Sequence, residues 1–165
     1  MWPRAIPSIH SKGANTTFIL PFRRDDASAA AEIGAGLRKL GPRTLLFLRE
    51  IEEIKWSVEG GASGHYLRDK PEAVGDNVRK IVVIGEEHGG KDTVVETWLI
   101  FSREVTAPDG MKAGYVEVAF RLDKGDAGDS LIVRPIDDST LVVFFPTIVP
   151  TNLGFLVQGP YRTTP

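Results

Sequence analysis

The chain has 165 residues, 42% of them hydrophobic, with a formal net charge of −2 and no cysteine. This size favours one domain with a hydrophobic core, the charge gives no reason to expect nucleic-acid binding, and the lack of cysteine excludes disulfides, thiol nucleophiles and cysteine-based metal sites. No apolar run reaches the ~20 residues of a membrane-spanning helix, and the N-terminus lacks a signal-peptide pattern, so we predict a cytoplasmic protein that does not enter a membrane.

The N-terminal third contains the only clear helical pattern. Residues 1–15 hold two prolines and no periodicity, which predicts a loose lead-in, and TTFILPF (16–22) is typical of a strand that ends at its proline. An amphipathic pattern predicts a helix between the aspartates at 25–26 and the Gly-Pro pair at 41–42. The run RTLLFLREIEEI (43–54) fits a short second helix or a buried strand, and we favour a helical turn there.

From residue 54 onward the pattern is that of strands separated by turns rich in glycine and aspartate. In the strand at 115–122, Val116 and Val118 alternate with Glu117, which predicts one buried face and one wet face. One or two helices near the N-terminus and about seven strands in meander order predict an α+β fold with a mainly antiparallel sheet, forming a single domain over residues 16–165. The strands are expected at residues 54–58, 80–87, 93–105, 115–122, 131–136, 140–145 and 155–158.

Two segments that contain histidine offer atoms for chemistry. Glu86, Glu87 and His88 are metal-ligand types, but adjacent strand residues point to opposite faces, so a solvated strand end is the favoured interpretation. Ser63 and His65 lie in GGASGHY, which lacks the G-x-S-x-G nucleophile pattern and is interpreted as a mobile loop. The sequence therefore predicts neither a catalytic residue nor a metal ligand.

Three further features have both a functional and a structural interpretation, and the structural one is favoured for each. The glycines at 60, 61 and 64 could present N–H groups to a phosphate, but no phosphate-binding motif surrounds them. Asp137 and Asp138 could act as paired carboxylates, but Asp-Asp-Ser between two apolar runs is typical of a hairpin turn. Four aromatic side chains are expected in the core rather than on a ligand platform: Trp56, Trp98, Phe144 and Phe145.

Three short motifs follow one another along the chain: TTFILPFR (16–23), LVVFFPT (141–147) and LGFLVQGPYR (153–162). With the helix and strands between them, they resemble the segment that follows the nucleotide-binding domain in sacsin-like, heat-shock-chaperone-like ATPases of the GHKL superfamily. The first motif is similar to the last strand of the Bergerat-fold ATPase domain, without its leading glycine. The other two are similar to strand ends in the middle or transducer domain, and the resemblance covers most of residues 14–165.

The resemblance implies a non-catalytic middle or transducer module that couples the ATP state of a preceding domain of the same polypeptide to the rest of the protein. The family's E-x-x-x-N and D-x-G-x-G motifs do not occur here, so ATP and Mg²⁺ would bind the parent protein, of which this chain would be a fragment. Gln158 and Arg162 are the residues expected to contact phosphate or the neighbouring domain. A homodimer remains open, and no complete active site is expected in this chain alone.

Two other classes of function remain open on the residues alone. A self-contained ligand-binding or protein-binding scaffold would have a complete, capped sheet. A hydrolase would hold His65 or His88 in a pocket with acidic partners from distant strands. An apolar strand at 16–22, uncovered at a sheet edge, would instead favour a fragment with a missing neighbour.

Overall fold

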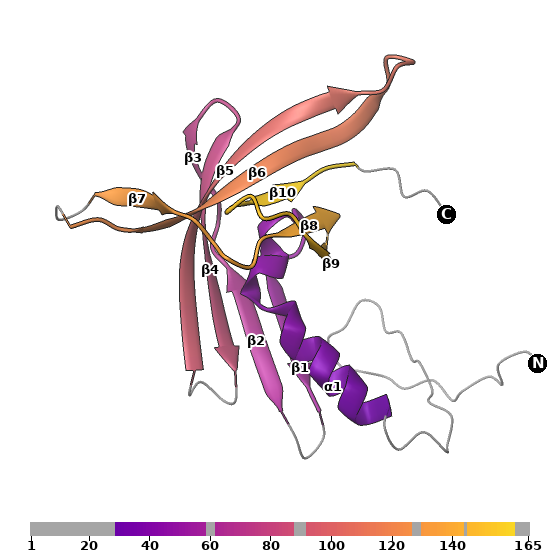
Figure 1. Ribbon diagram of the computed structural model, residues 1–165, viewed down its shortest axis with the longest axis vertical. Coiled ribbons are helices and arrows are strands. Elements are labelled where there is room, and N and C mark those ends of the chain that lie inside the picture. Colours follow the sequence, from indigo (N-terminus) through magenta and orange to yellow (C-terminus); the bar gives the residue numbers. More distant parts are fainter. Residues whose placement is uncertain (1–28, 59–61, 88–91, 127–129, 144, 161–165) are drawn as a thin grey trace, which may run out of the picture.

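The computed structural model describes residues 29–58, 62–87, 92–126, 130–143 and 145–160. The predicted lead-in and the predicted strand at 16–22 lie outside the described residues. In Figure 1, the helical segment lies against one side of a twisted sheet, and two long strands, β5 and β6, reach past the rest of it. The elements are α1 (Ala29–Leu40), η1 (Pro42–Leu46), β1 (Glu53–Ser57), β2 (Ser63–Arg68), β3 (Glu72–Gly75), β4 (Val78–Glu87), β5 (Asp92–Thr106), β6 (Lys112–Lys124), β7 (Leu131–Arg134), β8 (Thr140–Val143), β9 (Phe145–Pro150) and β10 (Leu156–Gln158).

The strands form one sheet of ten in the order β1-β2-β4-β5-β6-β10-β8-β9, with β3 beside β4 and β7 beside β6. The sheet is mixed, because β10 runs antiparallel to β6 and parallel to β8. The predicted α+β fold, with a mainly antiparallel sheet of about seven strands and one or two helices, is therefore wrong. The part of the chain that the structure describes is mostly β, with one α-helix and a mixed ten-stranded sheet.

The unexpected strands are short, and neighbouring strands hold them in place. β2 occupies residues predicted to lie in a mobile loop, yet it pairs with β1 on one side and with β4 on the other. β9 contains two prolines and forms the edge of the sheet beside β8, where a missing N–H is tolerated. Segments of this kind carry little strand pattern of their own, because their strand structure depends on tertiary pairing.

The buried face of β6 is the reverse of the predicted one. Glu117 is 1% exposed and Ala119 is fully buried, whereas Val116 and Val118 are only partly buried. The expectation of a wet face at Glu117 is therefore wrong. Alternation shows which residues of a strand share a face, but the elements packed on the sheet decide which face is covered.

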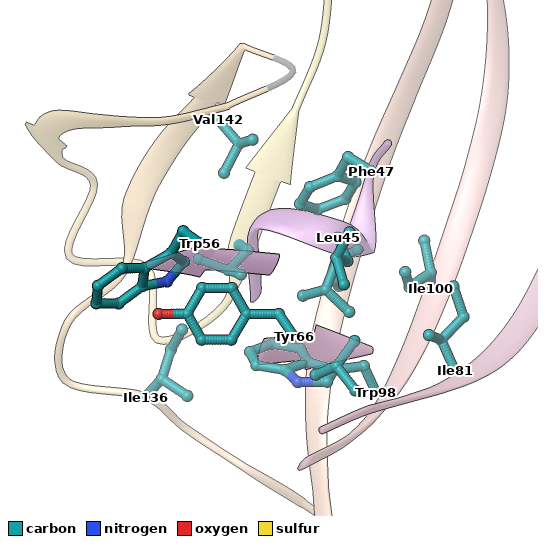
Figure 2. Close-up of a cluster of buried hydrophobic side chains, with 13 residues drawn as sticks. Leu45, Phe47, Trp56, Tyr66, Ile81, Trp98, Ile100, Ile136 and Val142 are labelled. Atoms are coloured by element: carbon teal, nitrogen blue, oxygen red, sulfur yellow. The ribbon is translucent and has the colours of Figure 1, made fainter. Parts of the chain in front are cut away.

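The hydrophobic core lies between the η1 segment and the inner face of the sheet. Leu45 of η1 and Phe47, which follows it, belong to one buried cluster with Tyr66 of β2 and with Trp98 and Ile100 of β5 (Figure 2). Burial of aromatic and aliphatic area on this scale is the main source of stability in such a sheet. A five-residue 3-10 helix is thus the element that covers the centre of the inner face.

The aromatic predictions have different outcomes. Trp56 and Trp98 are buried in the core, as predicted. Phe145 is exposed on the edge strand β9, so its predicted core position is wrong, and Phe144 lies outside the described residues.

The described part of the chain contains the α-helix α1 and the 3-10 helix η1. None of them is both long enough and apolar enough to span a bilayer.

Candidate binding pocket beside Gln158

A pocket of about 430 Å³ opens where the end of β10 meets the η1–β1 connection and the start of β6. Apolar groups of Phe47, Ile51 and Pro160 form much of its wall. Its polar groups come from three elements that are distant in sequence, and they are Arg49, Glu50, Tyr115, Glu117 and Gln158. Mostly apolar walls with a few convergent polar groups are typical of a binding site.

Gln158 is the only residue of the predicted phosphate or interdomain pair that the structure describes. It ends β10, where it lies opposite Glu117 of β6 and Val142 of β8, and it is 5% exposed. Among the described residues, no hydrogen-bond partner of its side chain is observed. Because Gln158 lines the pocket, its amide offers a donor and an acceptor to a molecule that enters it.

Glu117 is a buried carboxylate that binds two guanidinium groups. Its Oε1 accepts hydrogen bonds from Nη2 of Arg49 at 2.8 Å and from Oγ of Ser102 at 2.9 Å. The same oxygen forms an ion pair with Nη2 of Arg79 at 2.9 Å. A carboxylate can be buried in this way only when it is paired and hydrogen-bonded. The pairing brings two positive charges to the carboxylate of Glu117, of which the Arg49 guanidinium lines the pocket and the Arg79 guanidinium does not.

Arg49 is held from two sides and remains 45% exposed. Its guanidinium carbon lies 3.9 Å from the centroid of the Tyr115 ring, a cation–π contact, and its carbonyl oxygen accepts a 2.9 Å hydrogen bond from Arg68. Burial lowers the pKa of the Arg68 guanidinium, whose Nε has no partner among the described residues. The geometry therefore holds the Arg49 guanidinium at the pocket, stacked on an aromatic ring.

A second ionic network lies along the same face of the sheet. Arg43 of η1 donates to both carboxylate oxygens of the buried Glu96 and to Asp138 at 2.8 Å, and Nε1 of Trp98 donates to Glu96 at 3.1 Å. Hydrogen bonding to Glu96, followed by that to Asp138, raises the pKa of Arg43 further above its ordinary value. Because Asp138 is bonded to this arginine, the interpretation of a structural turn at residues 137–138 fits the geometry better than an acid–base pair.

Removing the Asp138 carboxylate is expected to have a small effect that depends on pH. The hydrogen bond from Arg43 lowers the pKa of Asp138 below its ordinary value of 3.8. The stabilisation that the Asp138 carboxylate contributes is therefore present above pH 3.8 and is lost as the pH falls through the lower pKa of the folded state. The side chain is 75% exposed, so Asp138→Asn is expected to cost less than about 1 kcal/mol at pH 7. Urea unfolding at pH 7, 5 and 3, with Asp137→Asn as control, checks this expectation, and a cost that persists undiminished at pH 3 would contradict it.

His65 forms a separate polar group on the far side of β2. Its Nε2 lies 2.7 Å from Glu53 and its Nδ1 lies 3.9 Å from Glu86, beside a pocket of about 400 Å³ that Ser63 also lines. Within the described residues, no serine hydroxyl is hydrogen-bonded to His65, so they contain no nucleophile–base pair of the kind that acyl transfer uses. His88 lies outside the described residues.

Metal binding has no support in the part of the chain that the structure describes. No group of three or more histidine, aspartate or glutamate side chains there is arranged to hold an ion. The glycines at 60 and 61 lie outside the described residues, whereas Gly64 is buried against Trp56.

The sequence predicted one residue of the pocket, Gln158, and missed the ionic groups around it. Arg162 lies outside the described residues. Glu117 and Arg49 are 68 residues apart, so no local pattern could join them. In comparisons with protein-family models, curated proteins and solved structures, no match to this chain is found.

Proposed function

We propose that this chain is the non-catalytic coupling module of a cytoplasmic, GHKL-type ATPase, which transmits the ATP state of a preceding domain to the rest of the protein. The observation that carries the proposal is that the amide of Gln158 lines a pocket at the end of β10 and has no hydrogen-bond partner among the described residues. The donor and the acceptor of this amide are open to the pocket, so a molecule or domain that enters the pocket can supply their hydrogen-bond partners. The similarity of LGFLVQGPYR (153–162) to a transducer strand end points to the same position.

The place of β10 in the sheet suits a coupling role. β10 lies between β6 and β8, and β6 in turn pairs with the long strand β5. A contact at Gln158 that forms in only one nucleotide state would therefore act on the centre of the sheet rather than on a loose end. Such a contact would bias the arrangement of the two domains, because a ligand shifts an equilibrium by its differential affinity for the two states.

The proposal assigns no chemistry to this chain. ATP and Mg²⁺ would bind the preceding domain, and Gln158 together with Arg162 would contact phosphate or that domain when the two close. A group delivered from a second domain stabilises charge in the reaction only in the closed arrangement, which would link hydrolysis to conformation.

The test compares ATP hydrolysis by this chain with hydrolysis by a protein that also contains the preceding domain of the native gene. We expect the short chain to be inactive and the two-domain protein to be active. Gln158→Met should lower the turnover of the two-domain protein several-fold, because it removes the amide and keeps a side chain of similar shape. Leu156→Met, also buried on β10, is the matched control and should leave turnover unchanged.

Two results would overturn the proposal. One is nucleotide binding or hydrolysis by the short chain itself, which would place a complete site within it. The other is a two-domain protein whose ATP turnover is the same with and without this chain.

A further inference from the structure

The charges around the Gln158 pocket cancel. Three charged side chains line it, namely Arg49, Glu50 and Glu117. Arg79 does not line the pocket but forms an ion pair with Glu117 at 2.9 Å, so two arginines balance two glutamates. An ion that entered the pocket would lose hydration without meeting an unmatched opposite charge. The electrostatics therefore favour a neutral ligand.

The open hydrogen-bonding groups require a donor and an acceptor in the ligand. Gln158 lies opposite Glu117 in the β10–β6 pair, so both side chains lie on the same face of the sheet. The amide of Gln158 has no hydrogen-bond partner among the described residues, and it presents an acceptor oxygen beside N–H donors. A second amide group matches both, because its N–H donates to the oxygen while its carbonyl accepts from the N–H.

The walls and the volume of the pocket favour a small molecule with an apolar body. Phe47, Ile51 and Pro160 offer apolar contact on several sides. The volume of about 430 Å³ lies in the range of small-molecule sites, which is roughly 300–1,000 Å³. A single asparagine or glutamine side chain from a neighbouring domain would leave most of this volume empty. A free molecule therefore suits the pocket better than one side chain.

We propose that this pocket binds a free, neutral small molecule that carries one amide group on an apolar body. The amide of the ligand pairs with the amide of Gln158 through two hydrogen bonds, and the apolar body contacts Phe47, Ile51 and Pro160. This binding belongs to the chain itself and goes beyond the coupling function. In the two-domain protein the ligand and the neighbouring domain would compete for the same amide, so each would weaken the binding of the other.

The test is an NMR titration of the 165-residue chain at pH 7 and constant ionic strength with four probes of similar length: hexanamide, 2-heptanone, hexanoate and hexylammonium. Hexanamide is expected to shift the side-chain amide signals of Gln158 in a saturable manner. The ketone 2-heptanone has the same shape but lacks the N–H donors, so it should bind at least about threefold more weakly. The two ions should bind at least about tenfold more weakly, because the pocket holds no unmatched charge.

Two variants and a control locate the site. Gln158→Met removes the amide and keeps a side chain of similar shape, and it should weaken hexanamide binding at least about threefold. Ile51→Ala removes apolar wall from a side chain that is 42% exposed, and it should also weaken binding. Leu156→Met, on the same strand but outside the pocket lining, should have no effect. Thermal unfolding shows whether each variant is folded.

Three results on the short chain would overturn the inference. They are no saturable shift of the Gln158 amide signals with hexanamide, binding of any other probe as tightly as hexanamide, and unchanged hexanamide binding by a folded Gln158→Met variant. Each of these results leaves the coupling function standing, because none of them involves the preceding domain.

Repeating the hexanamide titration on the nucleotide-free two-domain protein tests the choice of occupant. Retained binding supports a free ligand. Loss of binding would show that the neighbouring domain fills the pocket, and it would overturn the inference. Hexanamide binding without any effect of this chain on ATP turnover would overturn the coupling function alone.

Discussion

Replacing Glu117 by alanine is expected to lower the free energy of unfolding by about 3 kcal/mol, because it removes the carboxylate shared by two arginines. The side chain is almost fully buried, and Ser102 and the guanidinium groups of Arg49 and Arg79 all contact its Oε1. Without it, like charges lie side by side in a poorly solvated region. The same change should also abolish the fixed orientation of Arg49 on which the pocket depends.

Urea unfolding of Glu117→Ala at pH 7 measures this cost, and Glu104→Ala is the matched control. Glu104 is also a β5–β6 carboxylate in an ion pair, with Lys112 at 2.6 Å, but it is exposed and its loss should cost less than about 1 kcal/mol. Equal losses of unfolding free energy in the two variants would show that the buried cluster stabilises the fold no more than an exposed ion pair does. The double variant Glu117→Leu with Arg79→Met should be less destabilised than Glu117→Leu alone, because the unpaired charge is removed as well.

Gly64→Ala is expected to destabilise the protein by about 2 kcal/mol, because the inner face of β2 has no room for a methyl group there. An added Cβ would lie 2.6 Å from Cε2 and 2.8 Å from Cζ2 of Trp56, which is opposite Gly64 in the β1–β2 pair. The indole is part of the core and cannot move without disturbing its neighbours. The glycine thus allows a tryptophan to lie flat against the neighbouring strand.

The matched control is the same substitution in the helix. Around Gly36 of α1 there is open space, so Gly36→Ala should stabilise the protein by about 0.5–1 kcal/mol through the higher helix propensity of alanine. Thermal and urea unfolding of the two variants should therefore give changes of opposite sign. A stabilising effect of Gly64→Ala would contradict the packing of Trp56 described here.

Gly64 also illustrates how a local pattern can mislead. In GGASG the residue resembles one of several loop glycines that could face a phosphate, and the sequence predicts a mobile loop. In the folded protein it is a buried strand residue whose role is to make room for Trp56. The reason is a contact across the sheet, and the sequence contains no local signal for it.

The long, strongly patterned elements could be predicted from the sequence. α1 and η1 lie where the apolar spacing and the Gly-Pro pair at 41–42 indicate them, and β4, β5 and β6 contain the predicted strands at 80–87, 93–105 and 115–122. The apolar residues of these segments recur with enough regularity for the elements to be recognised from the sequence. The burial of Trp56 and Trp98 follows in the same way from their size and apolar surface.

The amino-acid sequence by itself determined which residues of β6 share a face and that Gln158 ends a strand. Only the tertiary structure decided that the face with Glu117 is the buried one, and that Gln158 lines a pocket with Arg49. The physical reason is that a charged side chain is buried only when partners from distant segments pair with it. Those partners, Arg49, Arg79 and Ser102, come together only when η1 covers the sheet and β4, β5 and β6 pair in register.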